Sequence, residues 1–464
     1  MKSLSRARLA RVAALAAVCL MLGSGPVWSA PHALVRQLMS RSAQPPTDAF
    51  CRATFGVPCY SPQEMRTAYG LNGLLEAGFV GAGETIVIID SYGSPTIAAD
   101  LAAFDQGFGL PDPPSFTVLA PLGTVPWDPA KYHDQPGWAA ETTLDVEWAH
   151  AMAPGAAIVL LTSPVDETEG VQGLPEFLEL EKYALDHHLG KIISQSWSAT
   201  ENTLFRNTAG PEGPQVVAKY LAFHRRAAGE RVTLIAAAGD YGSSNPETNG
   251  VTLYPFPTVG FPASSPFVTG VGGTILYADT SGNYQSETVW NDPGCCAGGG
   301  GISQLFKAPE YQEFWLPREV RTQLGGMRGV PDVSYNADCN NAILVYLSYF
   351  GPDSAGYYGI CGTSEGSPQW AGIVTDLNQY AGRPLGFLNP SLYAIGGLGL
   401  FGSFGRDITT GKNALIGVPG AVAPGYSAGP GWDPASGWGT PNLVELPQHA
   451  FELLEHEAPS AGRR

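Results

Sequence analysis

Basic residues are scarce in this sequence of 464 residues, which has 25 Lys and Arg against 42 Asp and Glu. Because the resulting formal net charge of −17 repels a phosphate backbone, we expect no nucleic-acid partner. The apolar run near the amino terminus, Val12–Leu22, is shorter than the roughly 20 residues that span a bilayer. It follows four basic residues and precedes small or apolar ones, which predicts a secretory signal peptide over residues 1–29 and no stable membrane association.

Cysteine is also uncommon, with seven residues in the whole sequence. Cys19 would leave with the signal peptide, and the six that remain are Cys51, Cys59, Cys295, Cys296, Cys339 and Cys361. An even number in an exported chain indicates disulfide bonds, and with the signal peptide it predicts a secreted, extracellular or periplasmic protein. Cys51 and Cys59 are expected to pair because no other cysteine is near them in the sequence. The connectivity of the other four stays open.

Apolar segments typical of strands alternate along the chain with segments typical of helices. The strand candidates are residues 84–90, 115–120, 156–162, 191–197, 232–240 and 267–274, and the helix candidates are residues 96–108, 140–152, 172–188 and 215–229. This alternation predicts an α/β fold whose parallel sheet has helices on both faces. We expect a single large domain over residues 61–450, between a short leader at residues 30–60 and a tail at residues 451–464. The glycine run Gly298–Gly301 is interpreted as a flexible loop, because no Lys-Ser or Lys-Thr follows it to bind phosphate.

The segment Gly362-Thr363-Ser364 places a serine at a glycine-led turn that opens into an apolar, helix-like run. Free N–H groups and the dipole at a helix start stabilise negative charge beside the hydroxyl, which suits a nucleophile. Pro368 agrees with a helix start, the only part of a helix that tolerates proline. On its own such a serine is more often an ordinary N-cap, so Ser364 needs partners elsewhere in the chain.

Two acids, Glu141 and Asp145, are four residues apart in a helix-compatible segment and therefore share one helix face. Two neighbouring carboxylates repel each other, so a proton tends to be shared and one apparent pKa rises. A carboxylate of this kind can accept a proton from a serine under acidic conditions. The alternative is a solvated acidic helix face, although apolar residues between the acids and a buried strand after them argue against it.

Polar or aromatic residues also end three of the predicted strands, where the chemistry of parallel sheets is usually found. These residues are Asp90, Trp197 and Asp240. Asp240 precedes Tyr241-Gly242, so it is either a turn-capping acid or, if protonated, a hydrogen-bond donor to an oxyanion.

Together these motifs resemble those of the sedolisin family of serine-carboxyl peptidases over about residues 60–445. The further matching motifs are Phe261-Pro262-Ala263-Ser264-Ser265-Pro266, Val271-Gly272-Gly273-Thr274, Arg328-Gly329-Val330-Pro331-Asp332-Val333, Asp407-Ile408-Thr409 and Gly431-Trp432-Asp433-Pro434. The resemblance implies a subtilisin-like fold that cleaves peptide substrates. The sequence departs from the family in one way, because only about 30 residues separate the signal peptide from the first matching segment, so the usual long prodomain is expected to be missing.

The resemblance also implies a role for each matching residue. Ser364 would attack the peptide carbonyl, and Glu141 would act as general base and then acid. Asp145 would orient Glu141 and share a proton with it, and Asp240 would line the oxyanion hole. A proton network would extend to Asp90 and Trp197, whose positions at strand ends match the family pattern.

A single structural Ca²⁺ is expected near the carboxyl terminus. Asp407 and Asp433 offer hard carboxylate oxygens, which suit Ca²⁺ better than zinc. As isolated loop acids they would more often be turn residues. It is the resemblance that implies a calcium site made by these two acids and the carbonyl groups of Ile408, Gly429 and Gly431.

The sequence therefore predicts a secreted, acid-active serine endopeptidase, expected to be a monomer. A glycosidase that uses Glu141 and Asp145 is disfavoured, because carboxylates one helical turn apart point the same way instead of flanking a bond. A Ser-His-Asp subtilase needs a histidine in a glycine-rich setting, which His133 and His150 lack. A secreted, catalytically silent peptide-binding protein stays open as the alternative, although it predicts damage to the catalytic set and none is visible.

Overall fold

An eight-stranded sheet forms the centre of the computed structural model, which describes residues 34–444. Its strands run in the order β11, β10, β8, β6, β3, β5, β4, and β16 also pairs with β10. Their bounds are β3 Thr85–Ser91, β4 Phe116–Leu119, β5 Ala157–Ser163, β6 Ile192–Gln195, β8 Thr233–Ala237, β10 Thr269–Ala278, β11 Tyr284–Val289 and β16 Val333–Asn336. Every pair except β10 with β11 is parallel, which confirms the predicted parallel sheet. The predicted signal peptide and the tail at residues 451–464 lie outside the described residues.

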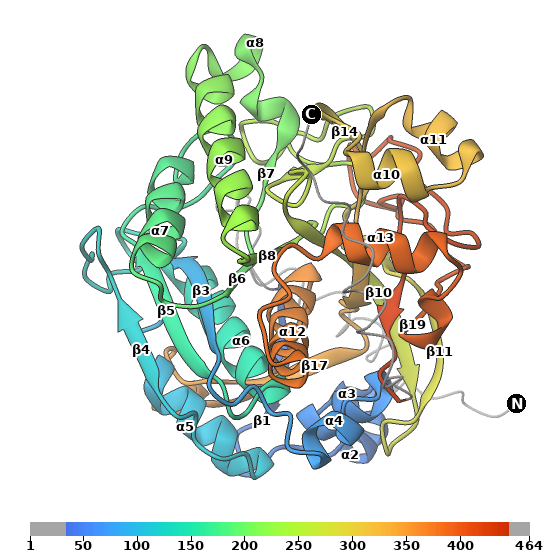
Figure 1. Cartoon of the computed structure of the whole chain (residues 1–464). Coiled ribbons are helices and arrows are strands. Elements are labelled where there is room, and N and C mark those ends of the chain that lie inside the picture. Colours follow the sequence, from blue (N-terminus) through green and yellow to red (C-terminus); the bar gives the residue numbers. More distant parts are fainter. Residues whose placement is uncertain (1–33, 445–464) are drawn as a thin grey trace, which may run out of the picture.

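Helices cover both faces of this sheet (Figure 1). On one face lie α5 (Ile97–Phe108), α6 (Gln135–Met152) and α12 (Gly366–Ala381), and on the other lie α7 (Leu174–Asp186) and α9 (Glu212–Gly229). In strand β3, four successive apolar residues, 86–89, face the two cores in turn. Ile86 and Ile88 belong to the core on the α6 side, whereas Val87 and Ile89 belong to the core on the α7 side. Alternate side chains of a strand point to opposite faces, so a sheet covered twice needs an apolar residue at every position.

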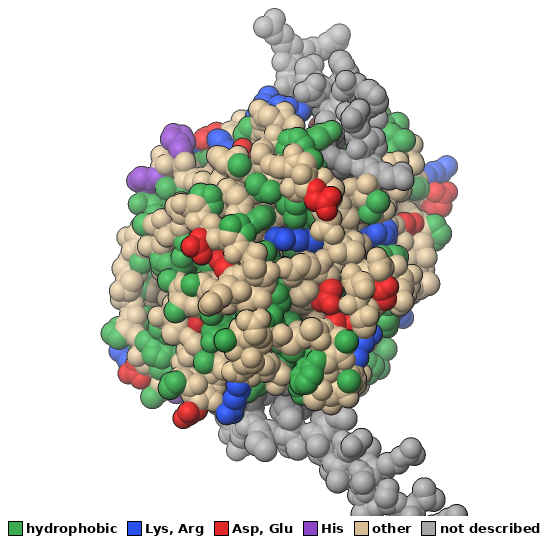
Figure 2. Space-filling model, turned by 90° about the horizontal axis from the view of Figure 1, so that it is seen from below, with side chains coloured by type: hydrophobic (Ala, Val, Ile, Leu, Met, Phe, Trp, Pro, Cys, Tyr) green, Lys and Arg blue, Asp and Glu red, His purple; other side chains and the backbone are tan. Residues whose placement is uncertain are grey.

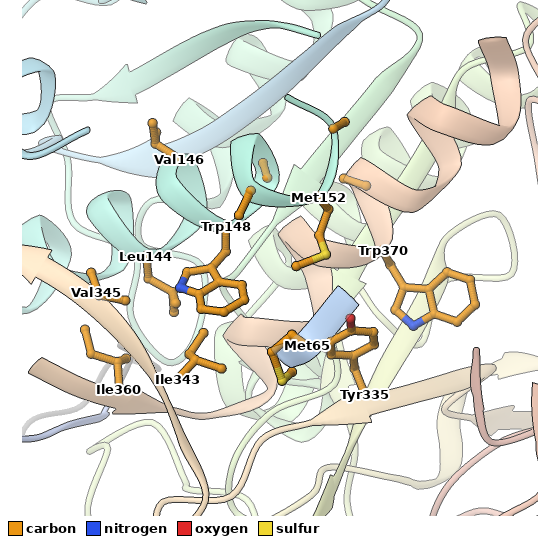
Figure 3. Packing of buried hydrophobic residues seen from close by; sticks show 14 of the residues in the cluster. Met65, Leu144, Val146, Trp148, Met152, Tyr335, Ile343, Val345, Ile360 and Trp370 are labelled. Atoms are coloured by element: carbon orange, nitrogen blue, oxygen red, sulfur yellow. The ribbon is translucent and has the colours of Figure 1, made fainter. Parts of the chain in front are cut away.

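A second, four-stranded sheet packs on the outer side of α6. It has the order β1, β18, β17, β2, with bounds Leu34–Ser40, Gly356–Cys361, Ala342–Leu347 and Cys59–Tyr60. Figure 3 shows Trp148 of α6 beside Ile343 of β17, with Ile360 of β18 close by. The Trp148 indole N–H donates a hydrogen bond to the carbonyl oxygen of Leu344 at 2.9 Å. The helix that carries Glu141 is therefore enclosed between two sheets.

The interpretation of residues 30–60 as a leader needs correction. Residues 34–40 form β1, which is hydrogen-bonded along its length to β18. Residues 48–55 form helix α2, whose Thr47 side chain caps its first turn by accepting from the Phe50 N–H. The described part of this segment therefore belongs to the domain, because its polar backbone is paired with strand and helix partners instead of with water.

The structure also pairs all six cysteines outside residues 1–33. The bond between Cys51 and Cys59 confirms the expected pair, and its Cα atoms lie 5.9 Å apart. The other two bonds join the neighbours Cys295 and Cys296, and Cys339 with Cys361. The spacing of these four residues in the sequence did not indicate this pairing.

Shorter elements complete the described chain. They are α2 Asp48–Phe55, α3 Pro62–Tyr69, α4 Asn72–Glu76, β7 Ala199–Thr200, η1 Glu201–Leu204, α8 Arg206–Ala209, β9 Gly260–Phe261, β12 Asn291–Asp292, β13 Cys296–Ala297, β14 Gly301–Lys307, α10 Glu310–Trp315, α11 Arg318–Leu324, β15 Met327–Val330, η2 Pro352–Ser354, η3 Thr363–Glu365, α13 Asn389–Gly397, η4 Phe401–Ser403, β19 Gly405–Arg406 and β20 Thr440–Pro441. Within residues 34–444 no helix combines the length and the apolar character needed to cross a bilayer. The face shown in Figure 2 has hydrophobic side chains scattered among polar and charged ones.

Trp148 tests the packing of α6 against the second sheet. We expect Trp148→Ala to lower the free energy of unfolding by about 3–5 kcal/mol, because it opens a cavity and removes the donor of the Leu344 carbonyl. Val422→Ala, at a side chain that is 66% exposed, is the matched control and should change stability by less than about 0.5 kcal/mol. Guanidinium unfolding of both variants measures the difference, and equal losses would contradict this account of the core.

Candidate active site

The predicted serine lies on a tight turn between β18 and α12. Gly362 follows the last residue of β18 and has φ 123°, a conformation that residues with a side chain rarely adopt. Ser364 lies in the single 3₁₀ turn that follows, is 3% exposed, and precedes α12 by two residues. Pro368 is the third residue of α12, as the sequence predicted. The serine is thus held at the amino-terminal end of a helix, where backbone N–H groups stabilise negative charge.

Asp240 contacts this turn directly. Its Oδ1 accepts hydrogen bonds from the backbone N–H and the hydroxyl of Thr363, each at 2.8 Å. The Gly239 N–H in turn donates to the Thr363 hydroxyl at 3.0 Å. A Cβ at position 362 would lie 2.7 Å from Asp240 Oδ2, so only glycine leaves room for this carboxyl group. Burial raises the pKa of Asp240 to about 6, although the two bonds from Thr363 oppose part of the rise.

The strand end that carries Asp240 is supported by Gly298–Gly301, the segment interpreted above as a flexible loop. That interpretation is wrong, because the whole segment is buried. The Gly299 N–H donates to the Gly239 carbonyl oxygen at 2.7 Å, and a Cβ at position 299 would lie 2.0 Å from the Ala238 carbonyl oxygen. The glycines are needed because two backbones approach too closely for any side chain.

Three carboxyl groups are buried close to one another on α6 and β3. Glu141 and Asp145 of α6 and Asp90 of β3 are all 0% exposed. Asp145 Oδ1 accepts a hydrogen bond from the Ser196 hydroxyl at 2.9 Å. Burial, followed by the charges of Asp90 and Glu141, raises the pKa of Asp145 well above its usual range. Burial also raises the pKa of Asp90 to about 7, so Asp90 and Asp145 hold protons in mildly acidic solution.

Helix α6, which carries Glu141 and Asp145, is also in contact with the serine turn. It packs against both the Thr363–Glu365 turn and α12. On the opposite side of α12, the Ser367 hydroxyl lies 3.0 Å from the Ser194 hydroxyl and accepts from the Gln195 N–H at 3.3 Å. The next residue, Ser196, is the one that contacts Asp145. Strand β6 and the residue after it thus make hydrogen bonds both to Ser367 of α12 and to Asp145 of α6.

Trp197 is placed differently from the other predicted residues. Its ring packs at the α7 side of the sheet, with centroid distances of 4.7 Å to Phe177 and 6.2 Å to Tyr220. Its indole N–H makes no hydrogen bond to the residues that the structure describes. The structure therefore groups Asp90 with Glu141 and Asp145 but does not link Trp197 to them by a hydrogen bond.

Two further residues of the site were missed in the sequence. Thr363 contacts Asp240 as described above. Glu365, the residue after Ser364, is completely buried and accepts a hydrogen bond from the Asn336 side chain at 3.1 Å. Burial raises the pKa of Glu365 well above its usual range. The hydrogen bond from Asn336 lowers the pKa, whereas the charges of Asp338 and Asp240 raise it further. An acid next to the nucleophile, in a run of small residues, was the available signal.

No histidine of the described chain takes the place of these acids. Three of the five histidines within residues 34–444 are exposed. The two buried ones contact other groups, since His150 Nε2 lies 2.8 Å from the Pro111 carbonyl oxygen and His224 Nδ1 lies 2.8 Å from the Ser265 hydroxyl.

The two acids of the predicted calcium site come together in the carboxyl-terminal part of the chain. The Gly431 N–H donates to Asp407 Oδ2 at 2.7 Å, and the Gly429 N–H donates to Asp433 Oδ2 at 2.9 Å. Burial raises the pKa of Asp433 to about 6 and also raises the pKa of Asp407. The loop between Asp407 and Asp433 thus folds back so that both glycines lie against the carboxyl groups.

Ile408 belongs to the same group. The Ser436 hydroxyl lies 3.1 Å from Asp433 Oδ1 and 3.4 Å from the Ile408 carbonyl oxygen. Strands β19 and β20 close the base of the loop. The donor set consists only of carboxylate, carbonyl and hydroxyl oxygens, which fits Ca²⁺ and does not fit zinc or copper.

The raised pKa of Asp240 predicts how stability depends on pH. The folded protein keeps this proton up to about pH 6, whereas the unfolded chain releases it near the usual pKa of about 3.9, so wild-type stability falls as the pH rises through this window. Asp240→Asn keeps an oxygen for Thr363 but cannot ionise. We expect the variant to gain up to about 3 kcal/mol relative to wild type between pH 4 and pH 6. Denaturant unfolding at several pH values measures this, with the exposed Asp353→Asn as control. A constant difference would contradict the buried, protonated Asp240.

Comparisons with known proteins show what the sequence and the fold are similar to. No protein-family model matches the sequence. Kumamolisin from Bacillus sp. strain MN-32 is 33% identical over 397 residues, which are 84% of this chain and 63% of that protein. Sedolisin from Pseudomonas sp. strain 101 is 28% identical over 393 residues, 83% of this chain and 60% of that protein. The chain thus spans less than two thirds of the length of either relative.

A solved structure gives the same result for the fold. Pseudomonas sedolisin, a serine-carboxyl proteinase complexed with two molecules of pseudo-iodotyrostatin, superposes with a TM-score of 0.69 at 26% identity. The match covers 86% of this chain and 99% of that chain. The likeness extends over nearly the whole catalytic chain of that protein, so the subtilisin-like α/β fold implied by the motifs is confirmed. By its fold, its serine turn and its buried acids, this chain belongs to the sedolisin family.

Proposed function

We propose that this protein is an acid-active serine-type endopeptidase that hydrolyses peptide bonds through an acyl-enzyme on Ser364. The observation that carries the proposal is the pair of 2.8 Å hydrogen bonds from Thr363 to Asp240, which hold a carboxyl group against the turn of the buried serine. Helix α6, with Glu141 and Asp145, packs against the same turn. A nucleophile, a proton acceptor and an oxyanion donor therefore converge on one turn, as acyl transfer requires.

In the first step Ser364 Oγ attacks the carbonyl carbon of the scissile peptide bond while Glu141 takes the hydroxyl proton. Asp145 shares a proton with Glu141, and its bond to Ser196 keeps it in place. Glu141 then gives the proton to the leaving amine, and the acyl-enzyme forms. Water attacks the acyl-enzyme with the same general base and releases the second product.

Asp240 stabilises the negatively charged oxygen of the tetrahedral intermediate. Both hydrogen bonds from Thr363 go to Oδ1, which assigns the proton to Oδ2 as the donor. An ionised Asp240 would repel the intermediate, so activity requires the protonated acid. Because the pKa of Asp240 is raised to about 6, this requirement is met in acid and lost towards neutral pH.

The burial of Glu141 and Asp145 also bears on the alternative functions. Both are 0% exposed and lie on one helix face, so they do not flank an open groove as the two acids of a glycosidase do. A catalytically silent peptide-binding protein would have lost part of the catalytic set. Ser364, Glu141, Asp145 and Asp240 are all present in the arrangement described, which favours a working enzyme.

We further propose that one Ca²⁺ binds to Asp407, Asp433 and the carbonyl groups of Ile408, Gly429 and Gly431. The ion would join the two ends of the loop between Asp407 and Asp433 and would take no part in the chemistry. The donor set supports this proposal because every atom is a hard oxygen. The raised pKa values of Asp407 and Asp433 mean that the ion would have to compete with protons in acid.

We also propose that the protein is secreted and acts on unfolded or extended peptides as a monomer. Three disulfide bonds support an oxidising location outside the cytoplasm. The scattered hydrophobic side chains on the face in Figure 2 agree with a monomer, because stable interfaces bury contiguous apolar surface.

Replacing the nucleophile tests the proposed function. The wild-type protein should cleave an unfolded protein substrate at about pH 4 and lose activity towards pH 7. Ser364→Ala should lower the rate on the order of 10⁶-fold, because no other group forms the acyl-enzyme. Mass spectrometry of the products measures cleavage, and circular dichroism checks the fold. Ser281→Ala, at an exposed serine, is the control and should keep full activity. Cleavage by Ser364→Ala would contradict the nucleophile, and an inactive wild type would favour the silent peptide binder.

Removing calcium tests the second site. Excess chelator at about pH 6 should lower the melting temperature on the order of 5 °C, because an ion that binds only the folded state stabilises it by mass action. Differential scanning calorimetry measures the shift. Asp407→Asn should melt lower than wild type and respond little to chelator, whereas the control Asp279→Asn, in an exposed turn, should respond as wild type does. A melting temperature that chelator leaves unchanged would remove the site.

A further inference from the structure

Four cysteines form a connected group of sulfur atoms next to the catalytic turn. The disulfide between the neighbours Cys295 and Cys296 lies against the disulfide between Cys339 and Cys361. The Sγ atoms of Cys296 and Cys339 are 3.7 Å apart, and those of Cys295, Cys296 and Cys339 all lie within 4.8 Å of one another. Two disulfides at this distance are within reach of thiol–disulfide exchange, in which a thiolate attacks a disulfide sulfur.

Exposure differs sharply along this group. Cys295 is exposed, whereas Cys296 is 2%, Cys339 is 4% and Cys361 is 0% exposed. A reducing agent in solution can therefore reach Cys295 directly but cannot reach the bond between Cys339 and Cys361. Any reduction of the inner bond has to pass through the outer one.

Both disulfides are connected to the active site through the backbone. Cys361 is the last residue of β18, and the next residue, Gly362, donates its N–H to the Ala337 carbonyl oxygen at 3.0 Å. Cys296 begins β13, whose other residue, Ala297, donates its N–H to the Asp240 carbonyl oxygen at 2.9 Å. The sulfur group thus joins the segment before Ser364 to the segment that carries Asp240.

We propose that the bond between Cys295 and Cys296 is a reduction-sensitive site that passes thiol–disulfide exchange inwards to the bond between Cys339 and Cys361. The reductant is a dithiol, either a small molecule or a redox protein. Its thiolate attacks Cys295 Sγ, forms a mixed disulfide there and expels Cys296 as a thiolate. The second thiol of the reductant then closes on the first, which leaves Cys295 as a thiol and the reductant as a disulfide.

The second step is internal. The Cys296 thiolate attacks Cys339 Sγ, forms a new bond between Cys296 and Cys339 and expels Cys361 as a thiolate that takes up a proton. The two electrons of the dithiol end on Cys295 and Cys361, and one protein disulfide is exchanged for another. The exchange thereby breaks the disulfide between Cys339, which follows β16, and Cys361, which ends β18 just before the serine turn.

The expected consequence for catalysis depends on the proposed peptidase function. With Cys361 free, the start of the turn is held by the Gly362 bond to Ala337 but no longer by a covalent link. We expect peptide cleavage to fall in proportion to the fraction of Cys361 that is released. The chemistry of the sulfur atoms can be followed separately, so the exchange is testable even if the protein were not a peptidase.

The first experiment maps thiols in the wild-type protein. The full chain is treated with limiting dithiothreitol at about pH 8, where the reductant is partly thiolate, then quenched in acid, alkylated and analysed by peptide mass spectrometry. We expect alkylation at Cys295 and Cys361, a disulfide between Cys296 and Cys339, and an intact bond between Cys51 and Cys59. Alkylation at Cys295 and Cys296 with the bond between Cys339 and Cys361 intact would overturn the proposal.

A matched pair of variants isolates the internal step without any reductant. In Cys295→Ser, Cys296 is a free thiol 3.7 Å from Cys339 Sγ and should form the new disulfide, so that Cys361 is alkylated. In Cys296→Ser, the free thiol is Cys295, and Cys361 should be alkylated at least tenfold less. Equal alkylation of Cys361 in both variants, or none in Cys295→Ser, would overturn the exchange.

Cleavage assays on the same samples complete the test. If activity falls with the alkylated fraction of Cys361, the exchange controls the catalytic turn. If Cys361 is released while cleavage stays at the wild-type rate, the coupling to the active site is wrong. A wild type that cleaves nothing would count against the proposed function only, because the thiol map decides the exchange by itself.

Discussion

The burial of ionisable carboxyl groups is the constraint on which the active site depends. A carboxylate in the protein interior loses its hydration, and it is stable there only if it is compensated or carries a proton. Asp90, Glu141 and Asp145 are fully buried, and Asp145 has the charges of the other two close by. Protonation removes both the desolvation cost and the repulsion. The same acidic conditions therefore stabilise the fold and keep Asp240 protonated, so under the proposed function both stability and chemistry depend on pH.

The sequence allowed the central sheet, the helix face shared by Glu141 and Asp145 and the turn at Ser364 to be predicted, because these depend on local patterns. Strand β3 contains a short apolar run followed by an acid, Asp90, and Glu141 and Asp145 are one helical turn apart whatever surrounds them. Ser364 is recognisable from the glycine before it and the proline after it. In each case a few neighbouring residues determine the geometry, and the resemblance to the family then implied a chemical role for each residue.

The features that could not be predicted depend on partners far away in the sequence. The segment that forms β1 shows no clear period, and it becomes a strand because β18 supplies its hydrogen bonds from more than 300 residues away. Gly299 looked flexible in the sequence because the backbone that leaves no room for a side chain at this position belongs to Ala238 and Gly239, which are remote in sequence. Cysteine spacing could not indicate a bond between the neighbours Cys295 and Cys296. Glu365 was overlooked because its role depends on burial by residues of other elements.

The pairing of β1 with β18 has a consequence for how the protein is made. The strand that leads to Ser364 takes its partners from the first described strand and from β17, so its sheet is completed only when residues near both ends of the domain meet. Synthesis on the ribosome proceeds from the amino terminus, and most of the chain has emerged before β18 exists. An unfinished chain can form much of the central sheet but lacks the turn that carries Ser364. Under the proposed function, peptide cleavage therefore begins only after the residues near both ends of the domain have been made.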